Sequence, residues 1–202
     1  MNVTMPARHF VGLVLAGLAL ASCSPAAKQP DQPPPLAGAK IGGAFSLIDQ
    51  NGKPVTDRDF AGRYRIMYFG YTFCPDVCPT DMQVVGAALS QLDKDAPALA
   101  ARVVPIFVTI DPARDTPAVL KQFVAAFHPR MIGLTGSPAA IDAVAKEFAV
   151  YHAKGDPAPG GGYLMQHSSQ TYLMDPQGKP LALLPTDQGA KAVAAEIERW
   201  AR

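Results

Sequence analysis

Two closely spaced cysteines that directly follow an apolar segment are the feature that most constrains how this chain can fold. Residues 65–71 form a buried-looking strand, and the run Cys74-Pro-Asp-Val-Cys78-Pro follows within three residues. In a helix-like turn, two residues four apart share a face, with Cβ atoms about 5–6 Å apart. Both sulfurs can then reach one metal ion, or form a disulfide after a modest rearrangement. We also expect the following helix to lower the thiol pKa.

The rest of the pattern predicts strands alternating with helices. An Asn51-Gly52 pair between residues 44–48 and 53–56 predicts an N-terminal hairpin. Apolar periodicity predicts further strands at 102–110, 131–134, 167–174 and 181–184, and helices at 79–94, 117–127, 137–148 and 188–200, with a loop at 156–162. The predicted fold class is α/β, with a central mixed sheet flanked by helices. The two-cysteine turn between a strand and a helix makes this arrangement thioredoxin-like.

The first 40 residues predict export rather than a folded domain. Arg8 and His9 precede a short apolar run, and Leu-Ala-Ser-Cys23 resembles the lipobox of bacterial lipoproteins, in which the cysteine receives the lipid. The alternative is an ordinary cleaved signal with an unrelated cysteine. We expect a signal peptide at 1–22, a lipidated Cys23 with a proline-rich tether at 23–40, and one domain at 41–202. The chain would then be an exported, membrane-anchored lipoprotein facing the periplasm or the cell exterior.

The overall charge excludes one class of partner. The net charge is +1 over 202 residues, so it implies no strong electrostatic pull toward nucleic acid or anionic surfaces.

A third metal ligand must come from outside the cysteine turn. His128 lies at a helix end and fits a structural role, and His152 lies in a possible strand and fits a surface histidine with its hydrogen bonds satisfied. His167 follows a glycine-rich loop and is expected to begin a strand, so it is favoured, although the residues alone leave His152 open.

Two sulfurs and one imidazole indicate a soft or borderline ion. Thiolates select copper(I), and copper binds most tightly in the divalent series. Structural zinc is the competitor, but it prefers four protein ligands. The sequence leaves open the copper oxidation state and whether Met67 or water supplies a fourth ligand. We expect affinity to fall below about pH 6, because the ligands must be deprotonated.

Three motifs in order resemble the Sco/SenC family of thioredoxin-fold copper proteins. They are Cys74-Pro-Asp-Val-Cys78-Pro, then Asp111-Pro-Ala-Arg-Asp115-Thr, then His167-Ser. The resemblance implies that Cys74, Cys78 and His167 bind copper for the dinuclear copper centre of cytochrome c oxidase. The implied partners are the copper-binding subunit of that oxidase and an upstream copper donor or thiol reductant. Asp111 and Asp115 would lie near the site or face a partner, or would serve the start of the following helix, where Thr116 is a good N-cap.

Two other functions use the same cysteines. The dithiol could reduce a disulfide in the oxidase subunit, although the spacing is Cys-x-x-x-Cys and such an enzyme has no need of His167. A structural disulfide in a solute-binding or interaction lipoprotein is the third possibility. The combined motifs favour a metallochaperone over an enzyme.

Overall fold

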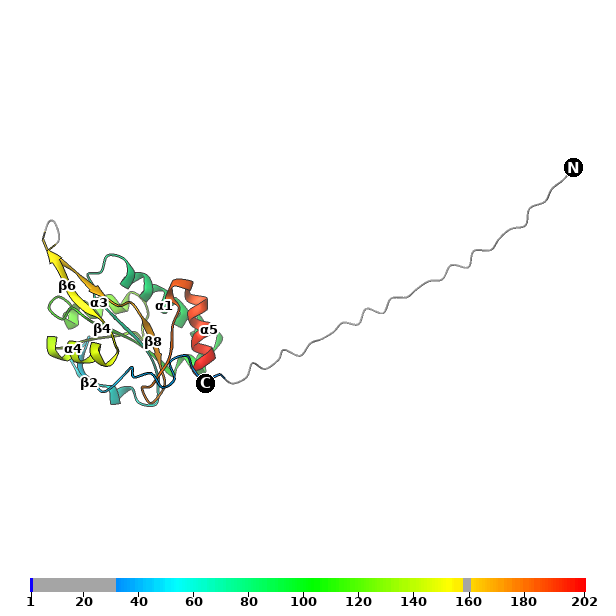
Figure 1. Cartoon of the computed structure of the whole chain (residues 1–202), viewed down its shortest axis with the longest axis horizontal. Coiled ribbons are helices and arrows are strands. Elements are labelled where there is room, and N and C mark those ends of the chain that lie inside the picture. The colour runs from blue at the N-terminus through cyan, green and yellow to red at the C-terminus, as the bar shows by residue number, and fades with distance from the viewer. Residues whose placement is uncertain (2–31, 158–160) are drawn as a thin grey trace. The chain divides into compact units, whose positions relative to one another are not determined.

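The computed structural model describes residues 32–157 and 161–202, together with Met1 (Figure 1). The predicted signal peptide, Cys23 and most of the predicted tether therefore lie outside the described residues. Residues 33–202 form one compact unit. At its start, a turn at residues 35–38 lies against the domain: the Leu36 N–H donates to the Leu181 carbonyl over 3.0 Å, and the Leu36 side chain packs on the core.

A seven-stranded mixed sheet is the centre of this unit, in the order β2-β1-β5-β4-β3-β8-β9. The strands are β1 (Ser46–Asp49), β2 (Pro54–Thr56), β3 (Tyr64–Gly70), β4 (Val103–Thr109), β5 (Ile132–Thr135), β8 (Thr171–Met174) and β9 (Pro180–Leu183). The strands β3, β4 and β5 are parallel, whereas β1 and β8 flank them in antiparallel orientation. All seven residues of β3 and of β4 are buried, as expected for strands covered on both faces.

Helices cover both faces of the sheet. They are α1 (Val77–Asp95), α2 (Pro97–Ala100), α3 (Pro117–Ala125), α4 (Pro138–Glu147) and α5 (Ala190–Trp200), with short 3-10 turns η1 (Asp57–Phe60) and η2 (Thr186–Gln188). Phe107 of β4 stacks on Tyr68 of β3 and contacts Phe123 of α3. On the opposite face, Phe69 contacts Phe148, which directly follows α4. Because neighbouring strand residues point to opposite faces, these aromatic contacts place α3 and α4 on different sides.

Local sequence signals set where three helices begin. The Thr116 hydroxyl accepts from the Val119 N–H, and the Ser137 hydroxyl accepts from the Ala140 N–H, so both residues cap helices as N-cap residues do. Helix α1 begins at Val77, two residues before the predicted start at Pro79. Proline is tolerated in a first turn, where its missing N–H would have no helical partner. Cys78 therefore lies inside the helix.

A separate two-stranded hairpin is the part of the fold that the sequence pattern did not predict. It consists of β6 (His152–Pro157) and β7 (Tyr163–His167), which project beside the main sheet (Figure 1). The predicted loop at 156–162 was wrong at its first residues, because β6 continues to Pro157. The predicted strand at 167–174 was wrong in its first half, because His167 ends β7, whereas its second half is confirmed as β8, which begins at Thr171. The two hairpin strands are polar and partly exposed, so they lack the apolar signal on which the prediction depended.

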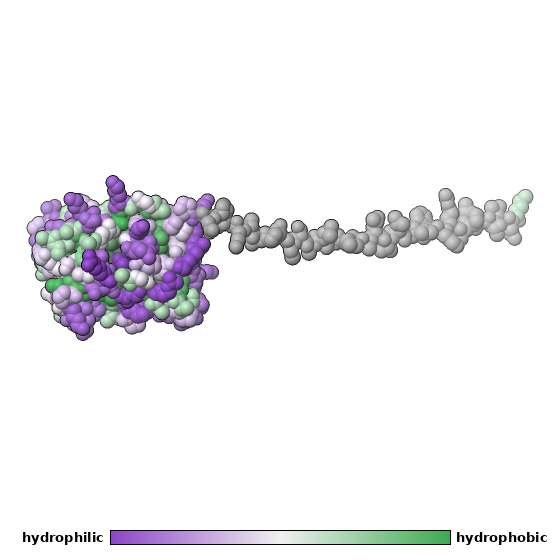
Figure 2. Space-filling model, turned by 90° about the horizontal axis from the view of Figure 1, so that it is seen from below, coloured by the Kyte–Doolittle hydropathy of each residue, from purple (hydrophilic) through white to green (hydrophobic). Residues whose placement is uncertain are grey.

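Hydrophilic and apolar side chains alternate in small groups over the face of the domain in Figure 2. Among the described residues, no helix has the length and apolar character needed to cross a bilayer.

Candidate metal centre

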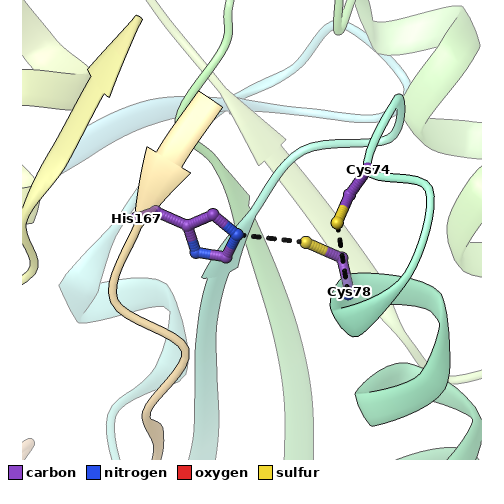
Figure 3. Close-up of side chains that lie close together, drawn as sticks. All are labelled: Cys74, Cys78 and His167. Atoms are coloured by element: carbon purple, nitrogen blue, oxygen red, sulfur yellow. Dashed lines mark hydrogen bonds between the residues drawn. The ribbon is translucent and has the colours of Figure 1, made fainter. Parts of the chain in front are cut away.

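Three side chains from three different elements converge beyond the C-terminal end of β3 (Figure 3). Cys74 lies in the loop after β3, Cys78 in the first turn of α1, and His167 at the end of β7. Their sulfur and ring-nitrogen atoms all lie within 4.8 Å of one another. The Cys78 Sγ is 3.4 Å from the His167 Nε2, and the Cys78 backbone N–H donates to the Cys74 Sγ over 3.5 Å. Both thiols are free, so the site has its reduced form.

Burial controls the chemistry of Cys78. Its side chain is fully buried, and its Sγ lies against Gly70. A Cβ added at Gly70 would come within 2.9 Å of the sulfur, so a larger residue there would collide with it. The expectation of a lowered thiol pKa was wrong for this residue: burial raises the pKa of Cys78 to about 12. Desolvation of the charged form therefore outweighs the field of the helix N-terminus.

The loop that carries Cys74 is attached to the next strand by a buried carboxylate. Asp115 is fully buried and accepts hydrogen bonds from the Thr72 N–H (3.0 Å), the Thr72 hydroxyl (2.6 Å) and the Thr109 hydroxyl (2.6 Å). Burial raises the pKa of Asp115, while these three donors lower it. Asp115 therefore fixes the position of the cysteine loop, and Thr116 caps the helix that follows.

His167 is oriented by the hairpin that carries it. Its Nδ1 lies 2.8 Å from the Ser168 carbonyl oxygen, which can only accept, so Nδ1 carries the proton and donates. In the neutral ring, Nε2 then has a free lone pair directed at Cys78. Ser168 in turn pairs with Tyr151 before β6, through the Ser168 N–H to the Tyr151 carbonyl and the Tyr151 N–H to the Ser168 hydroxyl. The Tyr71 ring packs edge-on against the imidazole.

Arg114 connects the hairpin to the cysteine loop. Its Nε donates to the Asp111 carboxylate, and its Nη1 donates to the Tyr163 carbonyl over 2.9 Å. The Tyr163 hydroxyl donates to the same carboxylate over 2.8 Å. The guanidinium carbon lies 3.7 Å from the ring centroid of Tyr163 and 4.9 Å from that of Phe73. Asp111 is thus the acceptor at the turn end of the hairpin, where Tyr163 pairs with Pro157, and the loop after β4 contacts both regions that hold the site.

The other two described histidines take no part in this cluster. His128 is buried, with its Nε2 3.1 Å from Asp93 Oδ2, which agrees with the structural role expected of it. The His152 Nε2 lies 3.3 Å from Asp142 Oδ1 on α4, although His152 pairs directly with His167 across the hairpin. Met67, considered as a fourth ligand, is fully buried within β3.

Sequence reasoning missed several residues that shape the site. Gly70, Tyr71 and Thr72 precede Cys74 without a chemical signature of their own, and Tyr163 fell between the loop and the strand that were predicted. Arg114 is the exception, because it lies inside the Asp111–Thr116 motif and an arginine next to two acids is a signal that could have been followed.

The donor set fits a soft metal ion. Two thiols and one imidazole, partly enclosed and already close together, match the ligands that copper(I) prefers. The fold and the site together define a thioredoxin-like domain with a two-thiol, one-imidazole metal centre in place of a simple dithiol.

Comparison with known proteins places this domain in a family. The family model described as SCO1/SenC matches residues 33–202, so the chain belongs to the SCO1/SenC family. Protein SenC of Rhodobacter capsulatus is 46% identical over 164 residues, which cover 80% of this chain and 71% of that protein. The mitochondrial SCO1 homolog 1 of Arabidopsis thaliana is 43% identical over 71% of this chain and 42% of its own length. The sequence-based family resemblance is confirmed.

Solved structures support the same conclusion. The copper-bound structure of ScoI from Bradyrhizobium japonicum superposes with a TM-score of 0.72 at 41% identity, over 79% of this chain and 99% of that one. The thioredoxin domain of a thiol-disulfide oxidoreductase from Bacteroides vulgatus matches with a TM-score of 0.56 at 15% identity, over 80% of this chain and 96% of that one. The predicted thioredoxin-like fold class is therefore confirmed.

Two solved structures of lower sequence identity are described with further properties. A structure from Bacillus anthracis, 26% identical with a TM-score of 0.65 over 80% of this chain and 95% of that one, is described as a SCO1/SenC family lipoprotein. The structure of BsSco is 25% identical, with a TM-score of 0.59 over 84% of this chain and 98% of that one. Its description reports a disulfide switch in that protein.

Proposed function

We propose that this chain is a copper chaperone that binds one copper ion through Cys74, Cys78 and His167 and delivers it during assembly of cytochrome c oxidase. The observation that carries the proposal is the convergence of these three donor atoms within 4.8 Å from three separate elements. The copper-bound ScoI structure, similar over 79% of the chain, supports copper as the cargo. BsSco is described as a member of a family of cytochrome c oxidase assembly proteins, which supports the destination.

The arrangement suits an ion that must be passed on. Three protein donors leave room for an incoming ligand, so a thiolate of the receiving protein can attach before a donor of this chain leaves. The proposed receiver is the copper-binding subunit of the oxidase, which would present thiols of its own. An upstream copper donor or a thiol reductant would keep the site supplied with copper or with reduced cysteines.

Copper stoichiometry tests the proposal directly. The reduced whole chain should bind one equivalent of copper, His167→Ala should bind it more weakly, and Cys74→Ser should not retain it through chelator competition. His152→Ala is the matched control, because this histidine lies opposite His167 but outside the donor cluster. The copper-loaded chain should then give up its ion to the reduced oxidase subunit. Absence of copper binding by the reduced wild type would overturn the proposal.

A second function is favoured by the two adjacent free thiols. In a thiol–disulfide exchange, Cys74 and Cys78 would lose two electrons and two protons and form a disulfide, while the disulfide of a partner would be reduced to two thiols. The disulfide switch described for BsSco supports this candidate. His167→Ala separates the two functions: copper delivery should fall, whereas reduction of a disulfide substrate should continue.

Membrane attachment completes the proposal. We propose that residues 1–22 are removed, that Cys23 is lipidated, that residues 23–40 form the tether and that residues 41–202 form the copper-binding domain on the periplasmic or exterior side. The Bacillus anthracis relative described as a lipoprotein supports this proposal. Labelling of expressing cells with a radioactive fatty acid should mark the wild-type chain and leave Cys23→Ser unlabelled. Equal labelling of both would contradict it.

A further inference from the structure

A second polar site lies at the other end of the central strand. Arg65 is the second residue of β3 and Gly70 the last, so the two ends are about 16 Å apart at the usual strand rise. A surface pocket of about 540 Å³ surrounds the Arg65 end. Its walls are the glycine-rich segment 38–44, Asp57 and the β8–β9 turn at residues 177–180. No residue of the metal centre lines this pocket.

Arg65 is a buried cation without a partner. Arg65 as a whole is only 6% exposed, and its Nε is buried with no hydrogen-bond acceptor. Among the described residues, no carboxylate oxygen lies within 4.0 Å of its guanidinium nitrogens. The guanidinium packs closely against Gly178 in the β8–β9 turn. A Cβ added at this glycine would come within 2.8 Å of the Arg65 Nη1. Buried charges in proteins are normally paired, because removing an ion from water is costly.

The charges around this guanidinium favour an anion. Lys40 and Lys179 line the same pocket, against the single carboxylate of Asp57. Asp175 and Arg63 are the other charged groups that act on Arg65 from nearby. Burial lowers the pKa of Arg65, and it outweighs the opposing effect of the two aspartates. The three cations that line the pocket therefore outnumber its one lining carboxylate.

We propose that this pocket binds a phosphate-type oxyanion through Arg65, assisted by Lys40 and Lys179. A guanidinium offers a planar pair of N–H donors that matches two oxygens of one phosphate, and the lysines add positive charge at the rim. Such an anion supplies the acceptors that Arg65 lacks and neutralises the surplus charge. The volume of about 540 Å³ accommodates a phosphate with a small organic substituent.

Two sources can supply this chemistry: free phosphate and the headgroup of an anionic phospholipid. The pocket is lined by residues 38–44, at the start of the folded unit. Gly38 follows Cys23 by 15 positions, and a chain of that length spans at most about 50 Å. If Cys23 is lipidated, as proposed above, a headgroup is within reach. The phosphate chemistry is the same for both sources, and the experiment distinguishes them.

Thermal unfolding of the whole chain in phosphate-free buffer tests the pocket. Inorganic phosphate should raise the Tm of the wild type by about 3–6 °C at ten times its dissociation constant, beyond the effect of sodium chloride at equal ionic strength. The variant Arg65→Met keeps the packing of the aliphatic stem and removes the unpaired charge. It should be more stable than wild type without phosphate and should not respond to phosphate. An equal response in both proteins, or a less stable Arg65→Met without phosphate, would overturn the proposal.

Surface variants keep the test independent of the buried position. Lys40→Gln and Lys179→Gln should each weaken phosphate binding several-fold, measured by calorimetry, while the exposed Lys53→Gln outside the pocket should not. Loss of affinity in all three alike would mean a general charge effect and would refute the site. Short-chain phosphatidylglycerol, used below its micelle concentration, identifies the source. Tighter Arg65-dependent binding of this lipid than of phosphate assigns the headgroup, and the reverse order assigns free phosphate.

Discussion

The cysteine loop and the β6–β7 hairpin each supply part of the metal centre, and they differ in how they are held. The cysteine loop connects the fully buried strand β3 to α1, with Cys78 inside that helix and Asp115 fixing Thr72. The hairpin is a separate two-stranded sheet with polar, partly exposed residues, and it includes Leu164, which is 51% exposed. Elements with few buried apolar contacts open at a lower free-energy cost than core strands.

This difference indicates how the site can both bind and release a metal ion. The two sulfurs are preorganised by the core, whereas the imidazole depends on the hairpin and on the polar cluster of Arg114, Asp111 and Tyr163 at its turn end. Movement of the hairpin would withdraw one donor and leave the dithiol in place. The hairpin is therefore the part of the site whose stability should tune copper affinity.

Removal of a sulfur should have the largest effect. Cys78→Ser replaces the buried thiol, which lies nearest to His167, with a hydroxyl that is a poor ligand for copper(I). We expect stoichiometric copper binding to be lost, as measured by metal analysis after chelator competition. Retention of wild-type affinity would mean that Cys74 and His167 suffice to bind copper. The proposed difference between a preorganised dithiol and an adjustable histidine would then be wrong.

Loss of the carboxylate that holds the cysteine loop should be the next largest. Asp115→Asn puts an amide N–H₂ group where one oxygen now accepts from Thr72 or Thr109, so at least one buried donor loses its acceptor. We expect the free energy of unfolding to fall by about 2 kcal/mol in urea titrations. Asp76→Asn, an exposed position on the same loop, is the matched control. Equal small effects from both would show that the loop does not depend on Asp115.

Alkaline pH should destabilise the reduced, copper-free protein through Cys78. Burial raises the pKa of this thiol from 9.0 to about 12, so the folded state keeps a proton that the unfolded state loses. The contribution to stability is fully present below about pH 9 and is lost progressively as the pH rises toward about 12. At pH 10 it should have fallen by roughly 1 kcal/mol.

The measurement is urea unfolding at pH 8 and pH 10 for wild type and Cys78→Ser. Other groups also titrate in this range, so the informative quantity is the difference between the two proteins in their loss of stability. The wild type should lose more. An identical pH dependence in both would contradict the burial of the Cys78 thiol.

A change at the turn end of the hairpin should have the smallest effect. Tyr163→Phe removes one hydrogen bond, from the hydroxyl to Asp111, at a cost of about 1 kcal/mol. Copper affinity should then fall about fivefold by chelator competition, while the rate at which the cysteines react with an alkylating agent stays unchanged. Tyr151→Phe, at an exposed tyrosine, is the control. Faster alkylation in Tyr163→Phe would mean that the two regions are not independent.

The accuracy of sequence-based prediction differs between the same two regions. The strand, the cysteine turn and the following helix carry strong apolar periodicity and a specific motif, so their positions followed from local sequence to within two residues. The hairpin consists of polar, partly exposed strands that pair only with each other and not with the main sheet, so its sequence was predicted as a loop and a later strand. His167 was therefore identified by its motif while its element was assigned wrongly.

Electrostatic environment was equally beyond the reach of the sequence. A helix start after Cys74 suggested a lowered thiol pKa, but the depth of burial over Gly70 decides the sign for Cys78. The role of Asp115 shows the same limit. Its position before an N-cap residue suggested a helix-dipole contact, whereas its partners, Thr72 and Thr109, lie on other segments of the chain.

The sequence by itself determined the fold class, the family and the three chemical groups of the metal centre, because these depend on periodicity and on motifs that are local in the chain. Only the tertiary structure decided that Arg114 joins the two regions, that Cys78 keeps its proton and that the Arg65 Nε has no hydrogen-bond acceptor. Such facts depend on distances between residues far apart in the chain and on their burial. These distances and this burial exist only in the folded protein.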